Sequence, residues 1–315
     1  MGASANTVLL NPHLFPLNLG WRLAFGLGAM LGLAVLLIRR YVPESPRWLM
    51  IHGRFNQANA IVDGIEQEVK RENKIDTLPE ADSEIAIRPR GTVSFLKIAR
   101  TMFKQYPKRS VLGFSLMISQ SFLYNAIFFT YALVLTTFYH IPATDVAIYQ
   151  IPFAIGNVLG PLLMGRLFDT TGRRQMISFT FITSAILLAI SGWMFSHGMF
   201  NATTQTIAWL VIFFFASAGS SAAYLIVSEI FPLETRALAI AFFYAVANAI
   251  GGTLPPLLFG YLIQTGKAVN VFYGDLIGTA LMLTAGIVEI LLGVKAEQQS
   301  LESIAQPLSA VEEEE

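Results

Sequence analysis

Residues 175–228 read QMISFTFITSAILLAISGWMFSHGMFNATTQTIAWLVIFFFASAGSSAAYLIVS and contain no Asp, Glu, Lys or Arg. A bilayer core about 30 Å thick is crossed by about 20 mostly apolar helical residues. The stretch is therefore long enough for two membrane-spanning helices, with a turn near His197 to Gln205.

Further apolar windows lie on both sides of this stretch. The window Leu23 to Ile38 is short, but Trp21 and Tyr41 bracket it as interfacial aromatic residues do. The windows predict seven spans in total and an all-α, polytopic membrane protein. Those outside 175–228 are Leu23 to Ile38, Ser110 to Thr144, Val146 to Gly165, Ala237 to Gly266 and about Val271 to Val294.

The composition agrees with a membrane protein. Of the 315 residues, 54% are apolar and 13% are charged, whereas soluble proteins carry roughly a quarter charged residues. Lys and Arg (21) balance Asp and Glu (21), so net charge gives no support for nucleic-acid binding. The chain has no cysteine, which excludes disulfides, thiolate catalysis and cysteine-bound metals.

The basic residues orient the spans. All Lys and Arg except Arg22 and Lys267 fall in 39–109, in 166–174 or after the fifth and seventh spans. The positive-inside rule places these segments in the cytoplasm of an inner (plasma) membrane protein. The expected order is an external tail 1–20, a span 21–39, a cytoplasmic loop 40–108, a six-helix bundle 109–294 and a cytoplasmic acidic tail 295–315.

The cytoplasmic loop is expected to be partly helical. Apolar residues recur at helical spacing from Phe55 to Val69 and again from Phe95 to Met102, with charges between them, which predicts two amphipathic helices. Residues 76–91 between them, with Pro79 and Pro89, are expected to form a linker.

Three short motifs stand at the cytoplasmic ends of the spans. They are PESPRW at 43–48, GRLFDTTGRR at 165–174 and EIFPLETR at 229–236. Together they resemble the sugar-porter branch of the major facilitator superfamily, which carries Pro-Glu-Ser-Pro-Arg after helix six, G-x-x-x-D-x-x-G-R-R between helices eight and nine, and Glu-x6-Arg at the end of helix ten. The resemblance covers about residues 20 to 294.

The resemblance implies a fold and a function. Family members have twelve spans in two halves and move a solute by alternating access between them. The seven spans here look like helices six to twelve, so we expect a fragment that lacks most of the N-terminal half and is inactive alone. The complete protein would be a secondary transporter of a small metabolite (a sugar, an organic acid or a related solute), coupled to protons. The alternative is a non-transporting half-transporter that acts as an interaction or sensor module.

The resemblance also implies a charged network that closes the inner gate. Losing one partner of such a pair leaves an uncompensated charge. The alternative is a solvated cytoplasmic face with topogenic arginines. The implied gate residues are Glu44, Arg47, Asp169, Arg173, Arg174, Glu229 and Arg236.

Substrate contacts are implied for four polar residues within spans. The family has Q-Q-x-S-G-x-N in helix seven, and the matching stretch here, residues 119–125, keeps Gln120 and Asn125. Phe122 and Leu123 replace the small Ser-Gly pair, which we expect to narrow a sugar site and to point away from a hexose. Hydrogen bonds between helices are the alternative role for these residues. The implied substrate residues are Gln120, Asn125, Asn157 and Tyr224.

The remaining sequence features give weaker evidence of function. Gly28 with Gly32 and Gly156 with Gly160 are small-xxx-small pairs, which predict close helix packing. Asp275 and Glu289 lie near the ends of the last span, which favours interfacial positions. The four histidines are isolated, so no metal site, cofactor or catalytic constellation is predicted.

Overall fold

The protein is described by a computed structural model over residues 14–78, 99–297 and 301–308, together with residues 5, 8, 9 and 299. Within these ranges every regular element is a helix. Seven segments are long and apolar enough to cross a membrane. The prediction of an all-α polytopic membrane protein with seven spans is confirmed.

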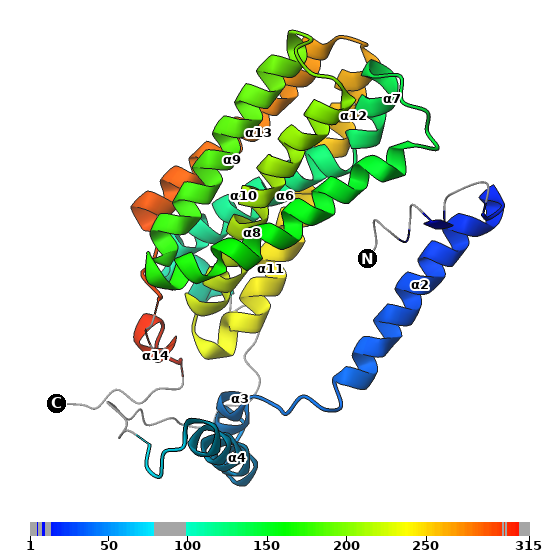
Figure 1. The fold of residues 1–315 in the computed structure, drawn as a ribbon. Coiled ribbons are helices and arrows are strands. Elements are labelled where there is room, and N and C mark those ends of the chain that lie inside the picture. The colour runs from blue at the N-terminus through cyan, green and yellow to red at the C-terminus, as the bar shows by residue number, and fades with distance from the viewer. Residues whose placement is uncertain are drawn as a thin grey trace.

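Six of the spans pack side by side into one bundle (Figure 1). Two of them are each built from two helices, with a break at 129–130 and another at 252–253. In order, the bundle consists of α6 (Pro107–Phe128) with α7 (Tyr131–Phe138), a 3-10 turn η2 (Val146–Tyr149) with α8 (Gln150–Thr170), α9 (Arg173–Ser196), α10 (Ala202–Glu229), α11 (Leu233–Gly251) with α12 (Leu254–Gln264), and α13 (Ala268–Leu292).

Small residues bring the bundle helices together. A Cβ at Gly156 would lie 2.6 Å from the carbonyl oxygen of Leu210, and a Cβ at Gly160 would overlap that of Phe214. The absence of these side chains lets α8 approach the backbone of α10. The packing prediction for this glycine pair is confirmed.

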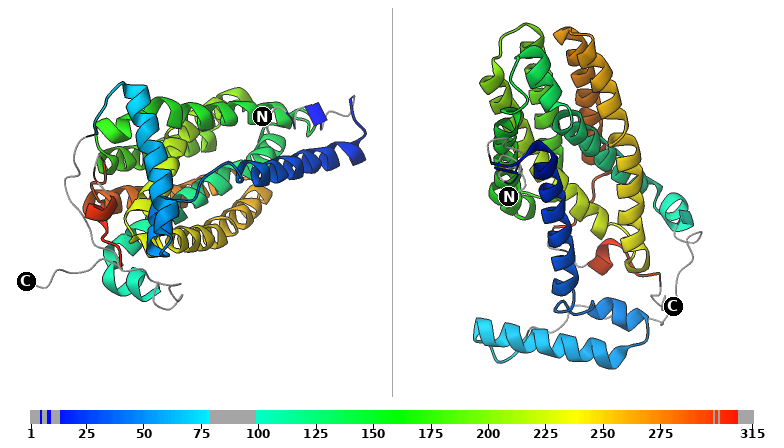
Figure 2. Two further views of the ribbon diagram at one scale, coloured as in Figure 1. Left: turned by 90° about the horizontal axis from the view of Figure 1, so that it is seen from below. Right: turned by 90° about the vertical axis from the view of Figure 1, so that its right-hand side faces the viewer.

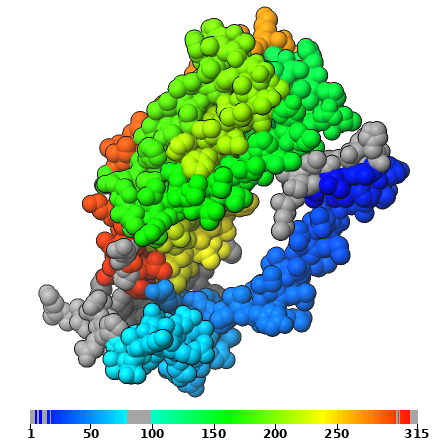
Figure 3. All heavy atoms as spheres, viewed as in Figure 1, coloured from blue at the N-terminus to red at the C-terminus, as the bar shows by residue number. Residues whose placement is uncertain are grey.

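The first span behaves differently from the other six. Helix α2 (Leu17–Ile38) has none of its apolar window buried, and open space separates most of it from the bundle (Figure 3). Nothing lies within 4 Å of a Cβ placed at Gly28 or Gly32. No described helix lies against that face of α2, so the packing prediction for this pair stays a prediction.

Further helices gather at the end of the bundle that carries the motifs, which we call the motif end. Helices α3 (Pro46–Ile51) and α4 (Phe55–Asn73) lie there, and α4 runs crosswise to α2 (Figure 2). The first predicted amphipathic helix is thus present. Most of the second predicted helix and most of the linker lie outside the described residues. A π-helix, η1, occupies Thr101–Gln105. The short α14 (Leu301–Ile304) follows α13.

One of the two carboxylates of α13, that of Glu289, is more enclosed than expected. Glu289 is 0% exposed, and neither of its oxygens accepts a hydrogen bond from the described residues. A Cβ at Gly286 would lie 2.6 Å from Ile182, so α9 and α13 approach closely one turn before Glu289. The expectation of an interfacial acid is wrong for Glu289, because this packing encloses its side chain.

Candidate functional site

A polar cavity of about 470 Å³ lies among α6, α8, α10 and α11. All four residues predicted to contact substrate line this one cavity, although they come from three different helices. No lining residue carries a formal charge. The lining residues are Gln120, Ser121, Tyr124, Asn125, Asn157, Ser217, Ser220, Ser221, Tyr224, Tyr244 and Asn248.

Hydrogen bonds hold several of these side chains in place. The Ser220 hydroxyl donates to Oε1 of Gln120 at 2.8 Å, and Nε2 of Gln120 donates to the Tyr224 hydroxyl at 3.3 Å. The Tyr124 hydroxyl donates to Oδ1 of Asn157 at 2.8 Å. These residues therefore make the helix-to-helix hydrogen bonds of the alternative interpretation while they also face the cavity. An oriented set of donors and acceptors is what a polar solute needs for specific binding.

The bulky residues expected to narrow the site do not reach it. Phe122 and Leu123 are 5% and 1% exposed and belong to the hydrophobic core. The Phe122 ring lies 6.5 Å from that of Phe259 on α12, and neither residue lines the cavity. The prediction that this pair narrows a sugar site is wrong, because both side chains leave α6 on its packed face. The sequence argument against a hexose substrate depended on this narrowing, so it no longer holds.

Several cavity residues were not predicted from the sequence, although their helical spacing indicates a shared polar face. On α10, Ser217, Ser220, Ser221 and Tyr224 follow the i, i+3, i+4, i+7 spacing of one helix face, and all four line the cavity. A polar stripe inside an otherwise apolar span points to a neighbouring helix or a cavity.

At the motif end, one compact ion-pair cluster joins α8, α9 and α10. The Arg173 guanidinium pairs with the Glu229 carboxylate, and its other terminal nitrogen lies 3.5 Å from Oδ1 of Asp169. Arg173 and Glu229 are 12% and 13% exposed, whereas Asp169 is 59% exposed. Removing one partner of the enclosed pair should therefore cost more stability than removing the water-facing Asp169.

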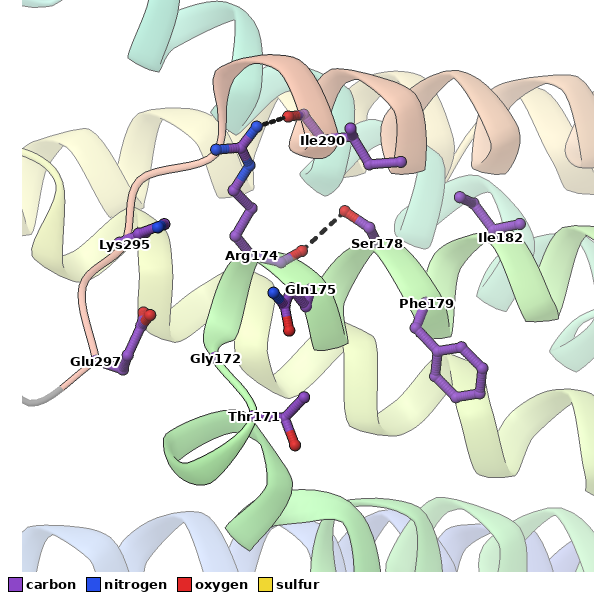
Figure 4. A pocket seen from close by; sticks show the side chains of 10 residues that line it. All are labelled: Thr171, Gly172, Arg174, Gln175, Ser178, Phe179, Ile182, Ile290, Lys295 and Glu297. Atoms are coloured by element: carbon purple, nitrogen blue, oxygen red, sulfur yellow. Dashed lines mark hydrogen bonds between the residues drawn. The ribbon is translucent and has the colours of Figure 1, made fainter.

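Arg174 lies apart from this cluster. Its guanidinium turns to the end of α13 and donates to the carbonyl of Ile290 (Figure 4). It lines a second pocket of about 740 Å³ between α9 and α13. The two neighbouring arginines of the Gly-Arg-Arg motif thus bind different helices: Arg173 contacts α8 and α10, and Arg174 contacts α13.

A second charged cluster links α3 to α14. Arg47 Nε lies 2.7 Å from Oε1 of Glu302. Arg236 is half-buried, with Arg47, Glu302 and Glu234 as its charged neighbours. Oε2 of Glu234 accepts a hydrogen bond from the backbone N–H of Leu308 at 2.9 Å. The segment after α13 therefore folds back onto the motif end.

Two residues change the membership of the predicted network. Glu44 is exposed and makes no ion pair or hydrogen bond within the described part of the chain. Arg109, predicted only as a topogenic charge, donates to the carbonyls of Ile230 at 2.5 Å and Ile304 at 2.7 Å. It joins α6 to the ends of α10 and α14. Its partners are backbone carbonyls, so no residue-type pattern in the sequence marks this contact.

The Arg47–Glu302 pair predicts a small effect on stability. Arg47 is 49% exposed and Glu302 is 22% exposed, so water screens their attraction. Glu302→Gln is expected to change the free energy of unfolding by less than about 1 kcal/mol. Thermal unfolding of the purified protein in detergent measures the change. A loss well above that value would show that the pair is more enclosed than its exposure indicates.

The fold and the pocket together define the class. Six spans pack into one bundle, four of its helices line an uncharged polar cavity, and charged side chains gather at one end. This arrangement resembles one lobe of a major facilitator transporter. The chain belongs to the sugar (and other) transporter family, which matches residues 5–307. The members of this family are transporters rather than enzymes.

Individual relatives agree with this membership. The chain is 26% identical to membrane transporter D1 of Leishmania donovani, over 82% of this chain and 47% of that protein. It is 25% identical to the inner membrane metabolite transport protein YdjE of Escherichia coli, over 91% of this chain and 61% of that protein. It is 22% identical to the niacin transporter NiaP of Acinetobacter baylyi, over 91% of this chain and 62% of that protein. The chain thus spans about half to three fifths of the length of these relatives.

Proposed function

We propose that this chain is the C-terminal lobe, with the preceding helix, of a proton-coupled transporter that moves a small solute by alternating access. The observation that carries the proposal is the convergence of Gln120, Asn125, Asn157 and Tyr224 on one polar cavity among α6, α8, α10 and α11. The matched length supports a lobe, because the relatives carry a comparable further stretch of chain.

The cavity wall favours a solute bound through neutral hydrogen bonds. Amide and hydroxyl groups line it, with the rings of Tyr124, Tyr224 and Tyr244 between them. A carboxylate solute, such as the niacin named for one relative, would need a cation supplied by the opposite lobe, since an unpaired charge is expensive to bury. A sugar or another polyhydroxyl solute matches this wall as it stands.

The charged clusters support a gate at the motif end. In the proposed cycle, Arg173 with Glu229 and Asp169 holds the ends of α8, α9 and α10 together while the motif end is closed. The Arg47–Glu302 pair adds α3 to the same closed end. The distribution of Lys and Arg supports a cytoplasmic position for this end and for the C-terminus. The carboxylates of Asp275 and of the fully buried Glu289 are the groups of α13 that could carry a coupled proton.

Uptake reconstituted from two chains tests the proposal. Cells would express this chain alone, or with the N-terminal half of YdjE, and uptake of labelled sugars, polyols and nicotinate would be measured. We expect background uptake with this chain alone and solute uptake with both. Asn157→Leu should reduce that uptake at least tenfold, because it removes an amide from the cavity wall. Asn270→Leu, outside the cavity, is the matched control.

Each alternative outcome has a definite meaning. Uptake by this chain alone would contradict its assignment as one lobe of a two-lobed transporter. Two chains that purify together but move no solute would contradict transport and favour the interaction module.

A further inference from the structure

A third, much smaller cavity, of about 20 Å³, lies at the end of the bundle opposite the motif end, where α7 and α12 are found (Figure 1). Helices α6, α7, α9, α10, α12 and α13 contribute to its wall. It shares no lining residue with the two pockets described above. Its volume is enough for one water molecule or one small ion.

The carboxylate of Asp275 lies at this cavity without a cation. Asp275 lines the cavity from near the start of α13. A Cβ at Gly192 of α9 would lie 2.6 Å from its Oδ2, so glycine leaves room for the carboxylate between the two helices. Asp275 makes no ion pair or hydrogen bond with the described residues, and no Lys, Arg or His is among the described residues that line the cavity.

The rest of the wall makes a bare negative charge unfavourable there. Phe195, Trp209 and Phe259 are 7%, 7% and 3% exposed and form an apolar part of the wall. An ionised side chain within a membrane span is costly unless it is paired. The carboxylate therefore needs either a proton or a cation beside it.

The polar part of the wall offers further oxygen atoms. Helix α6 reaches the cavity with Ala126 and Ile127 of its last turn. The carbonyl end of a helix carries partial negative charge, and such ends of interrupted helices coordinate Na⁺ in other transporters. Thr130 and Gln205, each 3% exposed, also line the cavity.

The Gln205 amide is held in position beside the cavity. Its Oε1 accepts a hydrogen bond from the Tyr139 hydroxyl at 3.2 Å. An amide oxygen has two lone pairs, so one lone pair remains for a second partner. The carboxylate of α13 thus shares a small cavity with neutral oxygen donors from α6 and α10.

We propose that this cavity binds one Na⁺ ion, with the Asp275 carboxylate, the Gln205 amide oxygen and oxygens at the end of α6 as its ligands. A proton would neutralise Asp275, but it would need neither the adjoining space nor a second set of oxygens. A divalent cation would keep an excess of charge beside a single carboxylate, which is unfavourable in an apolar site. This assignment leaves Glu289 as the carboxylate of α13 for the coupled proton.

Thermal unfolding of the purified full chain in detergent tests the proposal. The midpoint would be compared in sodium, potassium and choline chloride at equal concentrations, so that ionic strength stays the same. We expect Na⁺ to raise the midpoint by about 3–5 °C over choline, the shift for an ion present at about ten times its dissociation constant. K⁺ should raise the midpoint less, because it is larger than Na⁺ and the cavity is small. Binding of radiolabelled Na⁺ should saturate at about one ion per chain.

Substitutions in the wall identify the ligands. Asp275→Asn keeps the size of the side chain but removes its charge, so it should abolish the response to Na⁺. Gln205→Leu should raise the Na⁺ concentration for half the response about tenfold, because one polar contact to the ion is lost. Asp145→Asn is the matched control, since Asp145 is exposed at the same end of the bundle and does not line the cavity. This control should respond to Na⁺ like the unaltered protein.

Several results would overturn the proposal. Equal midpoints in the three salts would show that the cavity holds water only, and a response to K⁺ as large as that to Na⁺ would contradict a Na⁺ site. An unaltered response in Asp275→Asn would place the ion elsewhere. If Asp275→Asn does not fold, an unaltered concentration dependence in Gln205→Leu would decide against the site. These measurements involve no solute transport, so failure of the two-chain uptake experiment would leave their outcome valid.

Discussion

Gly160→Val is expected to prevent α8 from packing against α10 and to destabilise the bundle by more than about 3 kcal/mol. A Cβ at this position would overlap the carbonyl oxygen of Phe214 and crowd the hydroxyl of Ser217. The carbonyl belongs to the helix backbone and cannot rotate away, so the two helices would have to separate. The yield of monodisperse protein and the midpoint of thermal unfolding in detergent measure the effect.

Gly165→Val provides the matched control for that substitution. Gly165 lies in the same helix, and nothing is within 4 Å of a Cβ placed there. The remaining difference is the lower helix propensity of valine, which is small beside the expected loss. Similar unfolding midpoints for the two variants would show that the close approach of α8 and α10 is not needed for stability.

Arg173→Met is expected to destabilise the protein by about 3–5 kcal/mol, because it leaves the enclosed Glu229 carboxylate without its cation. Glu229→Leu should have an effect of similar size. The double variant should recover most of the loss, since two apolar side chains replace a buried ion pair with little net change. Thermal unfolding of the four proteins forms a double-mutant cycle that isolates the coupling between the two residues.

Arg166→Ala is the control for this cycle. Arg166 belongs to the same motif but is exposed and makes no side-chain ion pair within the described chain, so its loss should change stability by about 0.5 kcal/mol or less. If Arg173→Met behaved like Arg166→Ala, the proposed stabilising role of the cluster would be wrong.

Arg173→Met also tests the proposed gate. The chain has no cysteine, so Ser121→Cys places a single thiol in the wall of the polar cavity. In a transporter assembled with an N-terminal half, Arg173→Met should make this thiol react faster with an impermeant reagent added from the motif side. Unchanged reactivity, with the protein still folded, would count against a gating role for Arg173.

Features that depend on local sequence pattern could be predicted from the sequence, for clear physical reasons. Lipid requires every backbone polar group to be satisfied within a helix, so windows without charges identified the spans. The motif residues of PESPRW and GRLFDTTGRR then located one end of the bundle. The four residues taken from the family pattern line one cavity, because their positions on α6, α8 and α10 follow from helix register.

The structure was needed wherever the identity of a partner mattered. Arg173 and Arg174 are adjacent in sequence, yet successive residues leave a helix about 100° apart, and the two guanidinium groups reach α10 and α13 respectively. Phe122 is predicted to narrow the substrate site, but it points into the core. Glu302, beyond the last span, supplies the partner of Arg47.

The sequence by itself determined the membrane class, the number of spans, the family resemblance and the candidate substrate residues. These properties depend on the local pattern of apolar, polar and charged residues. Only the tertiary structure decided which glycine pair packs, which arginine joins which helices, and that Arg174, Lys295 and Glu297 share a pocket. Such properties depend on which helix faces meet, and segments far apart in the chain bring those faces together.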